Sequence, residues 1–420
     1  MRNASLWCGL LGVDKTVVED VEFDEDAQVL IAHVRPRART RGRCGRCRRR
    51  CPAYDRGEGR RRWRALDLGT IQVMLESEAP RVSCREHGVT VAAVPWARHG
   101  AGHTRVFDEQ VAWLATQCSK SAVTELMRIA WRTVGAIITR VWEDVEARYD
   151  RFADLRRIGI DEISYKRGHR YLTVVVDHDS GRLVWAAPGR DKATLRVFFE
   201  ALGVERCAAI THVSADGADW IATVVAETCP NAIRCADPFH VVSWATDALD
   251  EVRRQAWNEA RGAVTQRRAG RATGRAKALK GARYALWKNP ENLTTRQQAK
   301  LAWIAKTDPR LHRAYLLKEG LRLVFQLPAS EAPAALDRWI GWARRCRIPS
   351  FVELQRRIVK HKDSILAAIE HGLSNGRIES VNTKIRLITR MAFGFRSPEA
   401  LIALAMLSLG GHHPTLPGRK

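Results

Sequence analysis

The chain has 420 residues and a net charge of +24, with 70 lysines and arginines against 46 acidic residues. A basic excess of this size indicates a polyanionic partner, nucleic acid in the first place, and disfavours an enzyme that acts without one. No apolar run approaches the roughly 20 residues that cross a bilayer, and the N-terminus is too weakly flanked for a secretory signal. We therefore expect a cytoplasmic protein of about two to four domains that keeps its cysteines reduced.

The first predicted elements are two strands, over residues 10–21 and 29–34, and a pattern of metal-ligand spacing follows them. Four residues form two pairs, each separated by two positions: Cys44, Cys47, Cys84 and His87. Two such pairs joined by a strand-rich segment predict a tetrahedral Cys₃His site for one structural Zn²⁺, with no open position for catalysis. Cys51 is a spare thiol that could replace a ligand, and four unrelated residues are the alternative.

The zinc pattern lies within a strongly basic stretch. Between Arg35 and Arg64 there are 14 arginines against two acids, Asp55 and Glu58. Arginine pairs well with phosphate oxygens, and a stretch this one-sided would repel itself without a polyanion. We expect contact with a DNA backbone here, although a solvated charged face is the alternative. Six arginines are candidate contacts: Arg48, Arg49, Arg50, Arg60, Arg61 and Arg62.

Apolar residues at helical spacing predict three helices, over residues 107–117, 121–129 and 131–145, with Ser121 as the N-cap of the second. Two short helices before a longer one are typical of a helix-turn-helix, whose last helix enters the major groove. A plain helical linker has the same periodicity, but the basic zinc module ahead of this segment favours the helix-turn-helix. Three basic residues are candidate DNA contacts: Arg128, Arg132 and Arg140.

From residue 156 the pattern alternates between strands and helices. Strands are predicted at 158–163, 171–177, 182–187, 210–214 and 232–235, and helices at 192–202 and 218–227. This order, β-β-β-α-β-α-β with a helix to follow, is that of an RNase H-like fold. Asp161 lies on the first strand and Asp216 directly follows the fourth. Because these strands are neighbours in that fold, we expect the two carboxylates to converge.

Further polar residues surround this core. Asp237 and His240 follow the last strand, where Asp237 can hold His240 in one tautomer while His240 orients a phosphate or water. A strand-to-helix cap with a buried histidine is the alternative. Glu379 begins a helical stretch beside the basic residues Arg377 and Lys384, which are candidate DNA contacts. Carboxylates among basic residues are typical of sites where divalent metal ions act on a phosphate backbone.

Residues 253–283 carry ten lysines or arginines against a single acid. They predict a long basic helix that breaks near Gly270 and Gly274 and contacts DNA. Two arginines there are candidate contacts: Arg267 and Arg268. Residues 400–409 predict an apolar final helix, suited to core packing or a dimer contact.

These motifs together resemble bacterial insertion-sequence transposases of the insertion sequence L3 (ISL-three) family, which are of the DDE type. The resemblance covers nearly the whole chain and is carried by the zinc ligands and by residues 158–165, 171–177, 214–216, 237–240 and 375–384. It implies that Asp161, Asp216 and Glu379 are the catalytic triad and hold two Mg²⁺ or Mn²⁺ ions per active site. It also implies a helical insertion, because the 162 residues between Asp216 and Glu379 exceed what the core needs.

The predicted architecture is therefore α/β, in four parts. These are a zinc-binding DNA-recognition module (1–104), a helix-turn-helix (105–150), an RNase H-like catalytic domain (151–250 and 360–410) and a helical insertion (251–359). The expected activity is cleavage of the inverted-repeat ends of a mobile element and joining of the 3′-hydroxyls to target DNA. The expected partners are double-stranded DNA and a second copy of the chain, in a bacterial cytoplasm. The alternatives are an RNase H-like structure-specific nuclease and a DNA-binding regulator derived from an inactive transposase.

Overall fold

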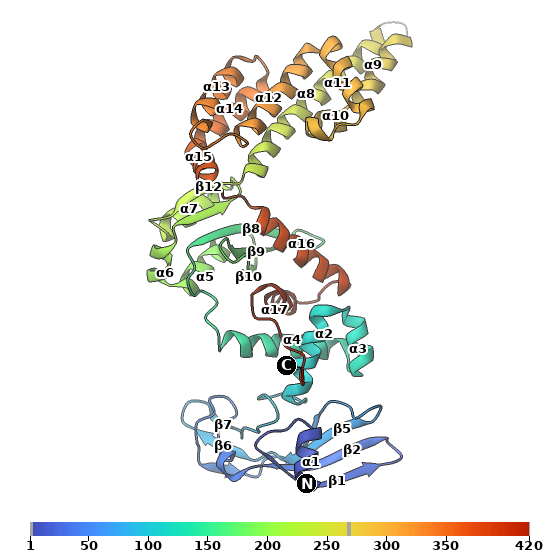
Figure 1. Cartoon of the computed structure of the whole chain (residues 1–420), viewed down its shortest axis with the longest axis vertical. Helices are drawn as coiled ribbons and strands as arrows, with labels where there is room; N and C mark the ends of the chain where they lie inside the picture. Colours follow the sequence, from blue (N-terminus) through green and yellow to red (C-terminus); the bar gives the residue numbers. More distant parts are fainter. Residues whose placement is uncertain (1–2, 267–269, 420) are drawn as a thin grey trace. The chain divides into compact units, whose positions relative to one another are not determined.

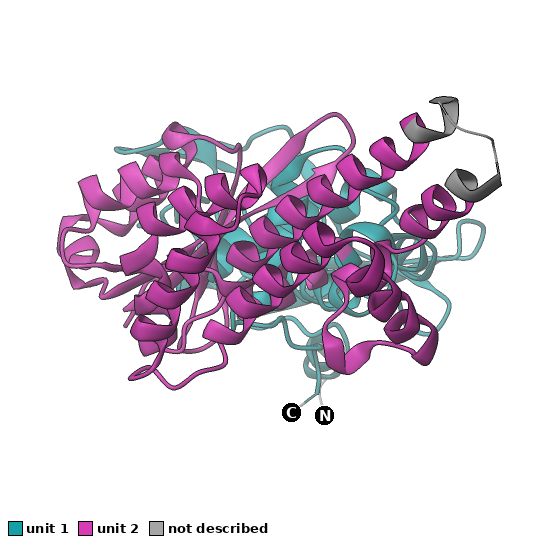
Figure 2. Cartoon of the chain, turned by 90° about the horizontal axis from the view of Figure 1, so that it is seen from above, with its two compact units in different colours: residues 1–150, 387–420 teal, residues 151–386 magenta. Residues whose placement is uncertain are grey.

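The computed structural model describes residues 3–266 and 270–419, which form two compact units (Figure 2). One unit comprises residues 1–150 and 387–420, as far as they are described, and the other comprises residues 151–386. Arg267 and Arg268 lie outside the described residues. Within the described part of the chain, no helix combines the length and apolar character needed to span a membrane.

The N-terminal part of the first unit consists mainly of β-strands (Figure 1). Its elements are α1 (Asn3–Leu10), β1 (Thr16–Asp24), β2 (Val29–Pro36), β3 (Ala53–Asp55), β4 (Arg60–Arg64), β5 (Gln72–Glu78), β6 (Arg81–Cys84) and β7 (Gly88–Val91). A four-stranded sheet has the order β1-β2-β5-β4, and a three-stranded sheet has the order β3-β6-β7. The core of the larger sheet includes the fully buried Val73 and Leu75 and an edge-to-face pair of Trp63 and Trp96.

The first element differs from the predicted one. Residues 3–10 form a helix, and the first strand begins only at Thr16, where a strand over 10–21 was expected. Between them the chain turns at Gly12, whose φ of +61° is left-handed, while Leu11 and Val13 are buried. A short apolar run fits a helix or a strand equally well, so periodicity alone did not locate this turn.

The three helices predicted after the β-rich part are confirmed. They are α2 (Arg105–Gln117), α3 (Lys120–Met127) and α4 (Trp131–Glu146). The N-cap of α3 is Ser119 rather than Ser121, since the Ser119 hydroxyl accepts a hydrogen bond from the Ala122 N–H at 3.2 Å. The final helix α17 (Pro398–Leu409) packs against α4 and α2 in this unit, although residues 360–410 were expected in the catalytic domain.

The second unit is built on a five-stranded sheet of order β10-β9-β8-β11-β12. The strands are β8 (Arg157–Lys166), β9 (Arg170–Asp177), β10 (Leu183–Pro188), β11 (His212–Ala215) and β12 (Ile233–Ala236). The first three are antiparallel, while β11 runs parallel to β8 and β12. Three helices accompany them: α5 (Lys192–Leu202), α6 (Val204–Ala209), which was not predicted, and α7 (Asp219–Thr228). Buried apolar side chains of the strands and helices form one core.

The remainder of the second unit is helical (Figure 1). Its helices are α8 (Pro238–Gln266), α9 (Gly270–Lys280), α10 (Arg283–Trp287), α11 (Thr295–Thr307), α12 (Pro309–Val324), α13 (Ala332–Arg345), α14 (Pro349–Lys360), α15 (Lys362–Glu370) and α16 (Gly376–Met391), whose residues from Leu387 onward belong to the first unit. Helix α8 runs unbroken through the expected boundary at residue 251. Buried residues such as Val241 and Leu249 at its start share a core with Leu317 and Phe351. The helical part therefore continues directly from the sheet.

Candidate active site and zinc centre

The strand register brings Asp161 and Asp216 together. Ser214 of β11 pairs with Gly159 of the parallel strand β8. Two positions further along both strands, Asp216 lies opposite Asp161, and residues at the same level of adjacent strands point to the same face. The register therefore makes the two carboxylates neighbours on the inner strands β8 and β11, at the level where β11 ends.

Asp237 extends this row by one strand. Ala215 pairs with Ala236 in the parallel ladder of β11 and β12, so the next position places Asp237 level with Asp216. The Asp237 N–H donates to the Ala215 carbonyl at 3.2 Å, which continues the ladder beyond the last strand residue. Asp161 within β8, Asp216 after β11 and Asp237 after β12 thus lie level with one another across three adjacent strands.

Both oxygens of Asp161 accept hydrogen bonds from the protein. The Glu162 N–H donates to Oδ1 at 2.8 Å, and the Asn382 side-chain amide donates to Oδ2 at 2.7 Å. Burial raises the pKa of the Asp161 carboxyl, and the charges of Asp216 and Asp237 add to this rise while the Glu162 N–H and His240 oppose it. The carboxylates are close enough to repel one another, so a cation between them would be stabilised.

Asp237 and His240 form a hydrogen-bonded pair at the start of α8. His240 Nδ1 lies 2.7 Å from Asp237 Oδ2, and this bond raises the pKa of the imidazole. Burial raises the pKa of the Asp237 carboxyl, but hydrogen bonds from His240 and the Asn375 N–H outweigh it and hold that pKa below its usual range. With Nδ1 occupied by Asp237, Nε2 of His240 is the nitrogen left for a substrate.

A buried hydrogen-bond chain fixes the start of α16 against the sheet. His178 Nε2 contacts the Ser214 hydroxyl at 2.7 Å, and that hydroxyl donates to Asn375 Oδ1 at 2.5 Å. The Asn375 N–H donates to Asp237 Oδ1 at 3.1 Å. Because all four side chains are at least nine-tenths buried, each lost bond would leave a costly unpaired group.

Glu379 lies on α16, the helix that also carries Asn382. The two are three residues apart, so they are neighbours on the helix surface. Asn382 is buried against Asp161, whereas Glu379 is exposed. The structure therefore places the third predicted carboxylate one helical turn from a residue that touches the first.

The acidic row has the ligand type that a hard divalent cation prefers, but its oxygen atoms are not all close enough to coordinate one ion together. In the described part of the chain, the cysteine and histidine group is the one set of three or more metal-binding side chains whose ligand atoms all lie within 4.8 Å. Carboxylate oxygens level with one another on adjacent strands, with Glu379 on an exposed helix face, fit Mg²⁺ or Mn²⁺. These ions take a few carboxylates and complete their shell with water and phosphate oxygens.

The four predicted zinc ligands do converge. Cys47 Sγ lies 3.7 Å from Cys84 Sγ, and His87 Nδ1 lies 3.6 Å from Cys84 Sγ and 3.9 Å from Cys44 Sγ. Tetrahedral ligands at zinc bond lengths lie about 3.4–3.8 Å apart, so these separations fit one ion. Hydrogen bonding to His87 lowers the pKa of Cys84 to about 6, which favours the thiolate that binds metal. Cys51 is not among the four.

Most arginines predicted to contact DNA around the zinc site also make contacts within the protein. Arg60 and Arg62 each pair with Glu76 at 2.7 Å, and Arg61 donates to the Ala101 carbonyl at 2.8 Å. The others are more weakly held. Arg49 lies 3.4 Å from Glu86, Arg48 donates to the Val94 carbonyl at 3.3 Å, and Arg50 is exposed.

The three helix-turn-helix candidates differ sharply in their surroundings. Arg128 caps α3 in a left-handed conformation, pairs with Asp67 and donates to the Thr70 carbonyl at 2.9 Å. Arg140 donates to the fully buried Asp108 at 3.0 Å. Arg132 is exposed in the first turn of α4. Arg128 and Arg140 thus have structural partners, and Arg132 is the one best placed to reach outward. On α16, Arg377 donates to the Asp179 carbonyl at 3.2 Å and Lys384 is exposed.

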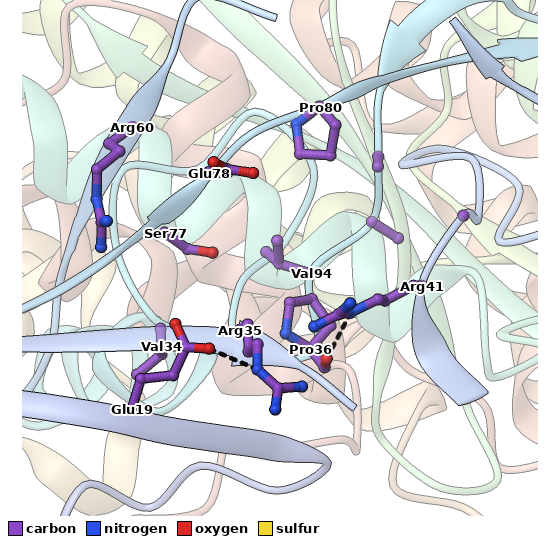
Figure 3. A pocket seen from close by; sticks show the side chains of 13 residues that line it. Glu19, Val34, Arg35, Pro36, Arg41, Arg60, Ser77, Glu78, Pro80 and Val94 are labelled. Atoms are coloured by element: carbon purple, nitrogen blue, oxygen red, sulfur yellow. Dashed lines mark hydrogen bonds and ion pairs between the residues drawn. The ribbon is translucent and has the colours of Figure 1, made fainter. Parts of the chain in front are cut away.

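A cavity of about 370 Å³ beside β1, β2 and β5 has mixed charge (Figure 3). Arg35 and Arg41 point into it, but Arg35 pairs with Glu19 at 2.5 Å and Arg41 donates to the Pro36 carbonyl at 3.0 Å. Glu78 also lines it. Of its two acids, Glu19 is paired with Arg35, so the cavity offers no row of carboxylates like that of Asp161, Asp216 and Asp237.

The sequence did not point to three helical residues that lie beside Asp161 or Gly217: Asn382, Trp244 and Arg357. The Arg357 guanidinium lies over the Trp244 ring, 3.6 Å from its centroid. Trp244 follows His240 by four residues on α8, the spacing of one helix face, and this was the available sequence signal. Arg357 belongs to α14, far along the chain, and no sequence pattern linked it to this site.

Three family models match successive parts of the chain. Residues 158–405 match the model of a transposase family of the DDE type, ISL3. Residues 92–142 match the helix-turn-helix domain of transposase family ISL3, and residues 40–87 match the zinc-finger of transposases IS204, IS1001, IS1096 and IS1165. A zinc module, a helix-turn-helix and a mixed α/β core with this match define a DDE transposase.

Two relatives that match over nearly their whole length narrow the classification further. It is 69% identical over 436 residues to a transposase for insertion sequence element IS1557 from Mycobacterium tuberculosis, a match covering 100% of this chain and 98% of the relative. It is 27% identical over 386 residues to a transposase for insertion sequence element IS1001 from Bordetella parapertussis, covering 91% and 92% of the two chains. The chain belongs to the ISL3 family of transposases.

Proposed function

We propose that this transposase cleaves DNA at the two ends of its insertion sequence and joins the freed 3′-hydroxyls to target DNA. The observation that carries the proposal is the row of Asp161, Asp216 and Asp237 along three adjacent strands. The catalytic core is RNase H-like in this proposal, supported by three antiparallel strands followed by two parallel ones in the order β10-β9-β8-β11-β12.

Asp161, Asp216 and Glu379 are the proposed metal ligands. A pair of bound divalent ions would activate the attacking oxygen and stabilise the leaving one. Asn382 holds Asp161 in one orientation, and the buried chain through Asn375 sets the position of α16 and hence of Glu379. His240, oriented by Asp237, presents Nε2 for a water molecule or a phosphate oxygen.

End recognition is assigned to the zinc module and the helix-turn-helix. One Zn²⁺ held by the Cys₃His group would fix the loops on which Arg48, Arg49 and Arg50 lie. The exposed Arg132 begins α4, the helix expected to enter the major groove. Two ends must be cut together, so we expect a homodimer or larger assembly acting on DNA in the bacterial cytoplasm.

The helical insertion offers a second DNA-binding surface. A cavity of about 720 Å³ lies between α9, α10 and α11. Among the described residues, its lining has four cations and no acid: Lys277, Lys280, Arg296 and Lys300. Arg275, also on α9, pairs with Asp308 instead. Cations gathered without a neutralising carboxylate favour a polyanion, so we assign this basic pocket (the four cations above) to flanking or target DNA.

The test is a cleavage and strand-transfer assay with Mg²⁺ or Mn²⁺ and labelled DNA carrying the element ends. The wild type should give metal-dependent 3′-hydroxyl products at the ends. Asp161→Asn, Asp216→Asn and Glu379→Gln should bind ends and give no product. Cleavage retained by any of the three would remove that residue from the triad. Tight end binding by a wild type that forms no product would favour the regulator.

A further inference from the structure

Arg357 brings a cation from the helical insertion to the loop that carries Asp216. A Cβ added to Gly217 would lie 3.6 Å from Arg357 Nη2 and 2.5 Å from Trp244 Cζ2. The residue after Asp216 is therefore packed beneath the tryptophan, and only glycine leaves room for that ring. The Ser350 hydroxyl donates to the Ala248 carbonyl at 3.2 Å, which ties the start of α14 to α8.

The Arg357 side chain is held in place without a salt bridge. Its guanidinium carbon lies over the Trp244 ring, 3.6 Å from the ring centroid, and the same ring lies 5.5 Å from His361 between centroids. In the described part of the chain, no carboxylate lies within 4.0 Å of Arg357, whereas its neighbour Arg356 pairs with Glu353 at 2.9 Å. The ring contacts one face of the guanidinium, so the N–H donors at its edge remain available.

The electrostatic setting favours an anion beside this guanidinium. Burial lowers the pKa of Arg357, and the charges of Asp216, Asp219 and Asp247 oppose that shift, so the group stays protonated. The proposed divalent ions would offset the charge of the acidic row, so a phosphate can approach it. A guanidinium next to Asp216 adds a fixed cation there, and its planar shape matches two phosphate oxygens at once.

We propose that Arg357, stacked on Trp244, binds a backbone phosphate of the DNA strand at the cleavage site. This inference rests on the proposed DNA cleavage at the site of Asp161 and Asp216. It gives the insertion a part in positioning the substrate, because α14 supplies the cation and α8 supplies the aromatic platform. The ligand is a phosphodiester group of the DNA backbone, and its binding by Arg357 does not depend on the base sequence.

Single-turnover cleavage compares the wild type with Arg357→Gln, Arg357→Lys and the matched control Arg356→Gln. Arg357→Gln should slow cleavage by about 10- to 100-fold, because a preorganised charge facing the phosphate is lost. Arg357→Lys should recover only part of the rate, since an ammonium lacks the planar fork. Arg356→Gln should match the wild type. Thermal unfolding of each variant verifies that the fold is intact.

Phosphate neutralisation then locates the contact. End binding is measured in Ca²⁺ with DNA carrying one methylphosphonate at each position within three nucleotides of the cut. At one position the wild type and Arg356→Gln should lose about fivefold or more in affinity while Arg357→Gln loses nothing further. Equal responses of all three proteins at every position, or wild-type cleavage by Arg357→Gln, would overturn the inference. If the wild type itself fails to cleave, it is the proposed function that fails.

Discussion

Asn382 is the residue through which α16 touches the acidic row. Its amide donates to Asp161 at 2.7 Å, and its side chain is almost fully buried. The carboxylate is thereby held in one rotamer, which a metal ligand needs if ions and phosphate are to meet in fixed geometry. The sequence pointed to Glu379 on the same helix but not to Asn382, because an uncharged amide is not recognisable as part of a metal site from its residue type.

Asn382→Leu should keep the branched shape of the side chain, with the same number of heavy atoms, and remove the hydrogen bond. We expect single-turnover end cleavage to fall by about tenfold with end binding nearly unchanged, since an outer hydrogen bond to a metal ligand contributes about 10- to 100-fold. Raising the Mn²⁺ concentration should restore part of the rate. A variant with wild-type rate at low metal would show that Asn382 only fills space.

Burial of His178 makes the stability of the fold depend on pH. Burial lowers the pKa of His178 to about 4, against about 6.5 in the unfolded chain. The unfolded state therefore binds more protons between these values, so the stability contributed by neutral His178 is fully present above pH 6.5 and is lost as pH falls towards 4.

Urea unfolding of the wild type and His178→Gln at pH 7.5 and pH 5 tests this. The wild type should lose more unfolding free energy on acidification than the variant, by on the order of 2 kcal/mol at pH 5. The glutamine amide can still donate to Ser214. An equal loss in both proteins would mean that other groups account for the acid sensitivity.

Among the elements, the zinc loops depend on the metal most directly. The smaller sheet, β3-β6-β7, has only 11 residues in strands. Two of the four zinc ligands belong to its β6–β7 hairpin: Cys84 is the last residue of β6, and His87 lies in the turn that follows. A sheet this small buries little apolar surface, so four metal bonds are expected to supply much of its stability.

Cys84→Ser should lose the zinc and Cys51→Ser should keep it. We expect about one zinc ion per chain in the wild type and in Cys51→Ser, and none in Cys84→Ser, by metal analysis. Specific end binding should be lost with the metal, while sequence-independent binding by the rest of the chain should persist. Zinc retained by Cys84→Ser would show that Cys51 replaces it.

The predicted helices agree with the structure where a full apolar stripe was present, as in α2, α4 and α5. The N-cap of α3 was misplaced by two residues because Ser119 and Ser121 fit the capping pattern equally well. The ion pairs of Arg128 and Arg140 within the protein could not be predicted for another reason. Their partners Asp67 and Asp108 lie 61 and 32 residues away, and local patterns carry no information about such pairs.

At the scale of the whole molecule, the charge of +24 is unevenly neutralised. Arg98 is buried among Asp108, Glu109 and Asp144, and Arg322 pairs with Glu291 and Glu319, so part of the basic excess stabilises the fold. The basic pocket of the insertion has no such acids in its lining. We therefore expect the salt dependence of DNA binding to come from a minority of the cations.

Replacing the four cations of the basic pocket by glutamine tests this: Lys277, Lys280, Arg296 and Lys300. The slope of log K against log salt for non-specific duplex DNA should become shallower by about three to four. The control changes four exposed cations of α11 and α13 outside the pocket, Lys306, Arg338, Arg344 and Arg345, and should alter the slope much less. Equal slopes for both variants would mean that net charge alone governs binding.

By itself, the sequence determined the zinc spacing, most of the strand and helix order of the second unit, and the position of Asp161 within one strand and Asp216 just after another. Those properties follow from residue spacing and from the period of each element. Only the tertiary structure decided that Asn382 orients Asp161, that Arg357 stacks on Trp244 beside Gly217, and that α17 packs with α4. Such contacts join residues far apart in the chain, and they depend on packing and burial, which no local pattern encodes.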